Sequence, residues 1–127
     1  GTPREPVEEA LAEGRDIILE IDYQGARSVR QLMGDRATLV FIAPPRWEAL
    51  SDRLEGRSTE DQEATRKRLA SAVHELAHVE LFEYLIVNDD VAAATDELEA
   101  VLMAERAQLN RLDWKPFVDG LLREAGA

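Results

Sequence analysis

The stretch DIILEIDYQG, residues 16–25, decides the fold class that we predict for this chain. It opens with the apolar, mostly β-branched run 17–19, which is typical of a strand buried on both faces of a parallel sheet. Glu20 and Asp22 follow. Because strand side chains alternate with a period of two, both acids are expected on one face, at the C-terminal end of the strand. In open α/β sheets, ligands bind at that end.

The role of Asp22 is open on the residue pattern alone. Buried carboxylates at a strand end are costly unless a metal ion, a ligand N–H group or a nearby arginine meets them. The alternative is that Asp22 only caps the helix that begins after Gln24 and Gly25, because aspartate is a favoured N-cap residue. The pattern therefore indicates either a ligand site or a helix cap.

Strands and helices are predicted to alternate along the chain, which indicates an α/β fold with a parallel sheet. Further buried strands are expected at Thr38–Ile42 and Tyr84–Val87. The inward-facing residues include Leu32, Val73 and Leu76. Helices are expected, in chain order, over residues 3–14 (with Thr2 as cap), 26–33, about 47–54, 60–81, 91–112 and 114–127.

Polar groups are expected to collect at one edge of this sheet. They come from Glu20 and Asp22, from the turn at residues 44–45, and from Asn88 and Asp89. All of them follow the C-terminal ends of predicted strands, and in parallel strands these ends share an edge. This is the geometry of a nucleotide site, although α/β folds host many functions.

Composition restricts the class of protein. A chain of 127 residues fits one domain, and the absence of cysteine excludes disulfides and thiol catalysis. The formal net charge of −11 argues against a nucleic-acid partner. There is no secretory signal pattern and no apolar run near the ~18 residues that a membrane span requires, so a soluble, cytoplasmic protein is expected.

A basic cluster stands out against this acidic background and suggests a small anionic ligand. For three of its members the alternative is a solvated helix face, and these are Arg53, Arg66 and Lys67. The whole cluster is Arg53, Arg57, Arg66, Lys67 and Arg68.

At this point the chain resembles a known family, the guanylate kinases, and in particular their bacterial branch. The order and spacing of six segments carry the resemblance, and Ala104-Glu105-Arg106 is similar to the bacterial members. The six segments are GTPR at 1–4, LEIDYQGA at 19–26, FIAPP at 41–45, RLEGR at 53–57, RL at 68–69 and YLIVNDD at 84–90.

The resemblance implies a transferase of purine metabolism that phosphorylates GMP with ATP and Mg²⁺, giving GDP and ADP. It implies that Thr2 contacts guanine and that Asp22 lies near the guanine and the transferred phosphoryl group. It also implies that Arg57 and Arg68 reach the ATP phosphates and the transition state, and that Asn88 lies beside adenine. Ser58 departs from the glycine that members often carry after the lid arginine. No metal ligand is assigned to this chain.

The family's G-x-x-x-x-G-K-[ST] phosphate loop does not occur in these 127 residues. The chain is therefore expected to be the C-terminal two-thirds of such an enzyme, without most of the GMP-binding lobe and inactive by itself. The implied fold is an incomplete P-loop nucleoside monophosphate kinase sheet flanked by helices. It forms a single partial domain over residues 1–127, with a core at 1–55 and 82–127 and a lid at about 56–68.

Two other functions are alternatives to the kinase. The sequence HELAH at residues 74–78 matches the zinc-protease pattern H-E-x-x-H, for which Glu80 or Glu83 would have to supply a third ligand. The second alternative is a non-catalytic guanylate kinase-like module that binds peptides. The arginines at 57 and 68 and Asn88 argue against that module.

One expectation concerns the phosphate-loop strand of the family. It should lie between the predicted strands at 16–22 and 38–42, so that these two do not pair directly. Without it, unpaired backbone groups and apolar side chains favour association with another chain. Homo-oligomer formation is therefore an open alternative.

Overall fold

The structure is a computed structural model that describes residues 4–51 and 62–127 of the chain. The chain divides into two compact units, Gly1–Ala37 and Thr38–Ala127. In the described ranges, no helix has the length and apolar character needed to cross a bilayer.

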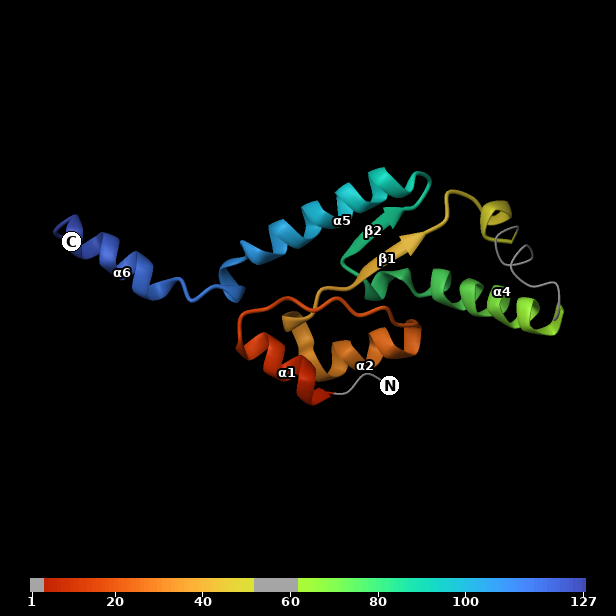
Figure 1. The fold of residues 1–127 in the computed structure, drawn as a ribbon, viewed down its shortest axis with the longest axis horizontal. Helices are drawn as coiled ribbons and strands as arrows, with labels where there is room; N and C mark the ends of the chain where they lie inside the picture. The colour runs from red at the N-terminus through yellow and green to blue at the C-terminus, as the bar shows by residue number, and fades with distance from the viewer. Residues whose placement is uncertain (1–3, 52–61) are drawn as a thin grey trace. The chain divides into compact units, whose positions relative to one another are not determined.

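The first unit contains two helices, α1 (Arg4–Ala12) and α2 (Tyr23–Met33), followed by the short 3₁₀ helix η1 (Gly34–Arg36) (Figure 1). Both helices were predicted, although α2 begins three residues earlier than expected. Gly34 ends α2 at φ 58°, in the left-handed region that glycine tolerates best. The guanidinium of Arg30 donates to the carbonyl oxygens of Gly34 at 2.7 Å and of Ala37 at 3.3 Å, and so secures the chain after the helix.

The predicted strand over residues 16–22 does not form. Among the described residues the sheet has two strands, and neither includes this segment. A strand is defined by its hydrogen bonds to a neighbour, so an apolar run predicts a strand only where a neighbour is supplied. The expected burial on both faces is also wrong, since Ile18 is 71% exposed.

The second unit is built on a parallel pair of strands, β1 (Val40–Ala43) and β2 (Tyr84–Val87), with Phe41 opposite Leu85 and Ile42 opposite Ile86. Both strands were predicted, and the bounds of β2 agree at both ends. The helices of this unit whose bounds lie within the described residues are α4 (Gln62–Ala77), η2 (Val79–Leu81), α5 (Val91–Arg106), η3 (Leu109–Arg111) and α6 (Lys115–Glu124), and residues 47–51 are helical as well.

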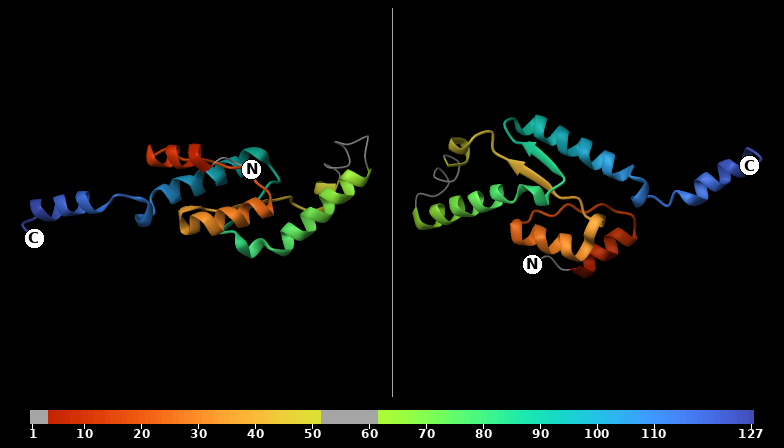
Figure 2. Two further views of the ribbon diagram at one scale, coloured as in Figure 1. Left: turned by 90° about the horizontal axis from the view of Figure 1, so that it is seen from below. Right: turned by 180° about the vertical axis from the view of Figure 1, so that it is seen from behind.

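The core of the second unit lies around the two strands. Phe41 and Ile86 are buried, and the ring of Phe41 meets that of Phe82 edge to face at 5.2 Å between centroids. Helix α5 packs against β2, and the two run side by side in the views of Figures 1 and 2. The long helices predicted over 60–81 and 91–112 each end earlier, as α4 and α5, and a separate 3₁₀ turn follows each.

Strand β1 is covered on one face of the sheet, and strand β2 is covered on the other face. Side chains in register project to the same side of a sheet, yet Phe41 is buried while its partner Leu85 is 59% exposed. The reverse holds for the next pair, in which Ile42 is exposed and Ile86 is 3% exposed. Each face of the sheet therefore carries uncovered apolar side chains.

Three residues predicted to face inward are exposed instead, and these are Leu32, Val73 and Leu76. The amphipathic pattern identifies which side of a helix is apolar, but it does not supply the element that covers that side. The prediction of helices at these residues is confirmed, and the prediction that other elements cover their side chains is wrong.

We predict that the isolated 127-residue chain self-associates, because uncovered apolar faces favour contact with another molecule. Sedimentation velocity should give a mass above that of the 14.2 kDa monomer. Leu85→Lys should weaken the association, since a charge on the open face must be desolvated, whereas Glu99→Lys on the exposed side of α5 should leave it unchanged. A cooperatively melting monomer at all concentrations would contradict this expectation.

Candidate functional site

The C-terminal ends of β1 and β2 are held together at one edge of the sheet. The backbone N–H of Asn88, just after β2, donates to the carbonyl oxygen of Ala43, the last residue of β1, at 2.7 Å. The turn at residues 44–45 leaves from the same edge. The prediction that these two strand ends meet is therefore confirmed within the second unit.

The side chain of Asn88 has an unusual position at this edge. Its Oδ1 atom is buried and has no hydrogen-bond partner among the described residues. A buried acceptor without a partner carries a desolvation cost that a ligand donor would relieve. A carboxamide offers one acceptor and two donor hydrogens, and this set suits the amino group and ring nitrogen of a purine edge.

Asp22 lies in the first unit, where it caps α2. Its Oδ1 accepts a hydrogen bond from the backbone N–H of Gly25 at 2.8 Å. The helix-cap reading is thereby confirmed, while the ligand role stays a prediction. A Cβ atom at Gly25 would lie 2.9 Å from the Cβ of Ile21, so the capped turn leaves no room for a larger residue. Glu20 and Asp22 are both exposed.

Of the predicted phosphate-binding arginines, Arg68 lies within the described residues, on the exposed surface of α4. Arg66, on the same helix, is 77% exposed and lies 3.9 Å from Glu63, which fits the predicted solvated helix face. Lys67 is exposed as well. The other predicted positions lie outside the described residues, and these are Thr2, Arg53, Arg57 and Ser58.

The histidines of the zinc-protease pattern lie one turn apart on α4, with 4.4 Å between ring centroids. The Nδ1 atom of His78 lies 2.7 Å from the carbonyl oxygen of His74, to which it donates in the matching tautomer. The carboxylate of Glu83, one of the two proposed third ligands, accepts from the backbone N–H of Leu39 at 3.3 Å. Among the described residues there is no group of three metal-ligating side chains, so the structure supplies no protease-type site there.

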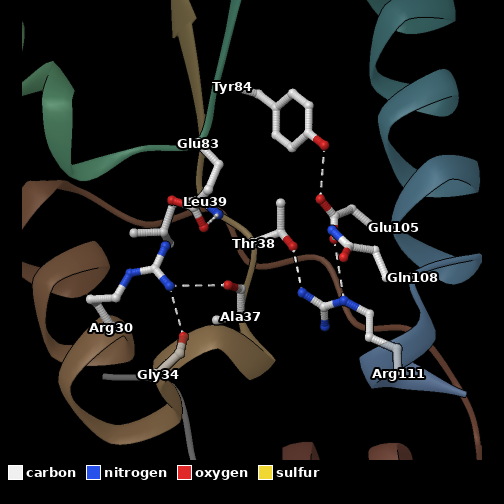
Figure 3. A network of polar contacts seen from close by, with 10 residues as sticks. All are labelled: Arg30, Gly34, Ala37, Thr38, Leu39, Glu83, Tyr84, Glu105, Gln108 and Arg111. Carbon is white, nitrogen blue, oxygen red and sulfur yellow. Dashed lines mark hydrogen bonds and ion pairs between the residues drawn. The ribbon is translucent and has the colours of Figure 1, made fainter.

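A polar contact network that was not predicted surrounds Glu105 near the end of α5 (Figure 3). The carboxylate accepts hydrogen bonds from the Tyr84 hydroxyl at 2.9 Å, from the Gln108 amide at 3.1 Å and from Nε of Arg111 at 3.2 Å. The Nη2 atom of Arg111 also donates to the hydroxyl of Thr38 at 2.7 Å. This Glu105 network joins β2, the end of α5, η3 and the segment that leads into β1.

The network holds one charge pair in a poorly hydrated position, with the Glu105 side chain only 11% exposed. Burial raises the pKa of Glu105, but hydrogen bonds from Tyr84 and Thr38 and the charge of Arg111 outweigh it, so the pKa lies below its ordinary value of 4.5. The hydrogen bond to Glu105 raises the pKa of the Tyr84 phenol above 10.0, because only the neutral hydroxyl donates.

The sequence contains a signal for the burial of Glu105. The partly or fully covered residues of α5 include Ala94, Leu98 and Val101, at helical spacings of four and three. The next position of that stripe is Glu105, which is buried. A glutamate on an apolar stripe is rarely buried without partners, so it indicates a fixed hydrogen-bond network.

We predict that the contribution of Glu105 to stability disappears in acid. Because its pKa is depressed in the folded state, the stabilisation is present above the ordinary value of 4.5 and is lost as the pH falls through the lower folded value. The pKa of the Tyr84 phenol is shifted in the opposite direction, upward. Its contribution to stability is therefore present below pH 10.0 and is lost as the pH rises through the higher folded pKa.

The measurement is the free energy of unfolding of the wild type minus that of Glu105→Gln, from urea titrations across the acid range. The difference should shrink below about pH 4.5. Glu99→Gln, at an exposed position of the same helix, is the matched control. A difference that stays constant down to strongly acid pH would show that the charge of Glu105 does not stabilise the fold.

Comparison with known proteins identifies the family to which this chain is similar. A family model described as guanylate kinase matches residues 1–105. The guanylate kinase of Carboxydothermus hydrogenoformans is 43% identical over 120 residues, which cover 94% of this chain and 58% of that protein. The guanylate kinase of Deinococcus radiodurans is 47% identical over 117 residues, covering 91% of this chain and 49% of the relative.

The fold has a solved counterpart as well. The crystal structure of guanylate kinase from Anaplasma phagocytophilum superposes with a TM-score of 0.73 at 30% identity, over 96% of this chain and 56% of that chain. The chain thus spans between 49% and 58% of the length of these relatives.

Proposed function

We propose that this chain, which belongs to the guanylate kinase family, is part of an enzyme that transfers the γ-phosphoryl group of ATP to GMP. The observation that carries the proposal is similarity along nearly the whole chain, at 43% identity over 94% of its length for one relative named guanylate kinase. Because the chain spans 58% of that relative, the activity is proposed for the whole protein.

Asn88 is the described residue with the best geometric support for a role in binding. We assign it to the adenine of ATP, as the family resemblance implies. Its carboxamide lies at the C-terminal edge of the parallel strands, where ligands bind in α/β sheets. Its buried Oδ1 atom has no partner among the described residues, and the adenine amino group is a donor of the required kind.

Arg57 and Arg68 are proposed to stabilise the transferred phosphoryl group. Phosphoryl transfer has a loose transition state with charge spread over oxygens, so catalysis depends on positioning and on positive charge. The guanidinium of arginine supplies several planar donors for such oxygens. The exposure of Arg68 on α4 leaves its head group accessible to a nucleotide. Residues of about 56–68 would form the lid, of which the described part is the beginning of α4.

The GMP side of the site is assigned to Thr2 and Asp22. A threonine hydroxyl both donates and accepts hydrogen bonds, which suits the guanine edge. The exposed carboxylate of Asp22 acts only as an acceptor when ionised, and it can accept from several groups at once. The backbone N–H of Gly25 donates to its Oδ1 atom. The cap would therefore leave an oxygen to face a guanine N–H group.

We propose Mg²⁺ as the cofactor that accompanies ATP, and when bound it would supply positive charge near the transferred phosphoryl group. The described residues contain no group of three metal-ligating side chains, so no ligand from this part of the chain is assigned to the ion. We further propose a cytoplasmic enzyme of purine metabolism, with GMP and ATP as its partners and without a nucleic-acid partner. The last point rests on the net charge of −11.

The second candidate function, a non-catalytic guanylate kinase-like binding module, is not favoured. The relatives that cover most of this chain at 41 to 49% identity are named guanylate kinases.

We predict that the complete protein converts GMP to GDP with ATP and Mg²⁺ and discriminates against AMP. The measurement is ADP release in a coupled assay, with GMP and AMP compared at equal concentration. Absence of GMP-dependent turnover in the folded, complete protein would refute the proposed function.

We also predict that Arg68→Ala in the complete protein lowers kcat by about 10³-fold, because removing a transition-state arginine can cost that much. Arg57→Ala should also lower kcat. Arg66→Ala is the matched control, since this side chain is 77% exposed and a surface substitution should change kcat by about twofold at most. Equal kcat values for Arg68→Ala and Arg66→Ala would assign Arg68 to the solvated surface.

A further inference from the structure

We propose that Glu105 and Arg111 are positioning residues that hold Asn88 in place at the nucleotide edge, although they lie at the opposite end of β2. The proposal deepens the proposed function, since it rests on the assignment of Asn88 to adenine. Both side chains lie near the start of β2, where Glu105 accepts a hydrogen bond from Tyr84, and Asn88 follows the other end of the strand.

The first step is the path of the chain around Asn88. Strand β2 ends at Val87, residues 88–90 turn, and α5 then returns alongside β2. The turn is fixed at the edge by two backbone N–H groups. That of Asn88 donates to Ala43 at 2.7 Å, and that of Ala92 donates to the capping carboxylate of Asp90 at 3.2 Å.

The second step is the closure of this hairpin-like unit at its other end. Tyr84 is the first residue of β2, and Glu105 is the last residue but one of α5. Their side chains meet through the hydrogen bond of 2.9 Å from the tyrosine hydroxyl to the carboxylate. Arg111 then ties the carboxylate to Thr38, which lies just before β1 (Figure 3).

The third step concerns the length of α5 between the turn and Glu105. Glu105 lies fourteen residues after Val91, which is about 21 Å along a helix at 1.5 Å per residue. A rigid helix held at both ends cannot rotate about the turn that joins it to the strand. When its far end is released, rotation about the turn is opposed mainly by packing against β2. The turn contains Asn88, so its side chain takes up the change in angle.

The fourth step is the charge pair itself. The side chains of Glu105 and Arg111 are 11% and 26% exposed, so water replaces a lost partner poorly. Arg111→Met leaves a buried carboxylate without its counter-charge, whereas Glu105→Gln keeps the shape of the side chain and removes its charge. We therefore expect both variants to loosen the end of α5, and the arginine variant to do so more strongly.

The test uses the complete protein with Glu105→Gln and Arg111→Met, and with Glu99→Gln as the exposed control on the same helix. We expect KM for ATP to rise by roughly two- to thirtyfold, the fold-change that corresponds to the coupling carried by substitutions in packed elements. KM for GMP should stay within about twofold of the wild-type value, which is the size of an ordinary surface effect. Hydrogen exchange should accelerate at the amides of Asn88 and Ala92 in the two network variants and not in the control.

Two results would overturn the proposal. One is an unchanged KM for ATP with unchanged exchange at Asn88 in folded Glu105→Gln. The other is a uniform loss of stability with equal changes in both KM values, which is the result expected of a merely structural network. If Arg111→Met does not fold, Glu105→Gln decides the matter.

Failure of the proposed function is distinguishable from failure of this inference. Absence of GMP-dependent turnover in the wild type refutes the function and leaves the exchange measurement intact. Faster exchange at Asn88 in Glu105→Gln than in Glu99→Gln then still supports the positioning role, and equal exchange refutes it.

Discussion

The buried carboxylate of Glu105 organises the second unit, because four separate segments meet at it. Tyr84 brings the start of β2, Gln108 and Arg111 bring the chain after α5, and Arg111 also reaches Thr38 before β1. Two short parallel strands bury little surface by themselves, so their stability depends on the helices around them. The network fixes α5 against β2 by directional bonds where apolar packing is limited to a few residues.

The same geometry links structure to the proposed chemistry. Parallel strands place all their C-terminal ends at one edge, and the bond from Asn88 to Ala43 holds two of those ends together. The Glu105 network lies at the opposite ends of the same strands. In the proposed function, one edge of the sheet would bind the nucleotide, while the network at the other edge would hold the strands and α5 rigid.

Much of the fold was predictable from local pattern. The bounds of β2, the approximate extent of β1 and the helices α1, α2 and α6 follow from apolar periodicity and from glycines at helix ends. The stretch 16–22 shows the limit of that reasoning, because a strand needs a partner that local sequence does not specify. Exposure of Val73 and Leu76 has the same origin, since pattern predicts an apolar face but not its cover.

The site was predictable in part. The strand-end position of Asn88 follows from the alternation of strands and helices, and the cap by Asp22 was one of two readings of its sequence context. Glu105 was missed, because a charged residue at the end of a helix is ordinarily interpreted as exposed. Its neighbours across the network are 21 and 67 residues away in sequence, at Tyr84 and Thr38, so no local pattern connects them.

The most direct test of this account is the coupling between Glu105 and Arg111, measured by a double-mutant cycle of unfolding free energies with Glu105→Gln, Arg111→Met and the double variant. Residues joined in one buried network should show a coupling of about 0.5–3 kcal/mol, so the double variant should lose less stability than the sum of the single variants. Strict additivity would contradict the account, because it would mean that the two side chains stabilise the protein independently.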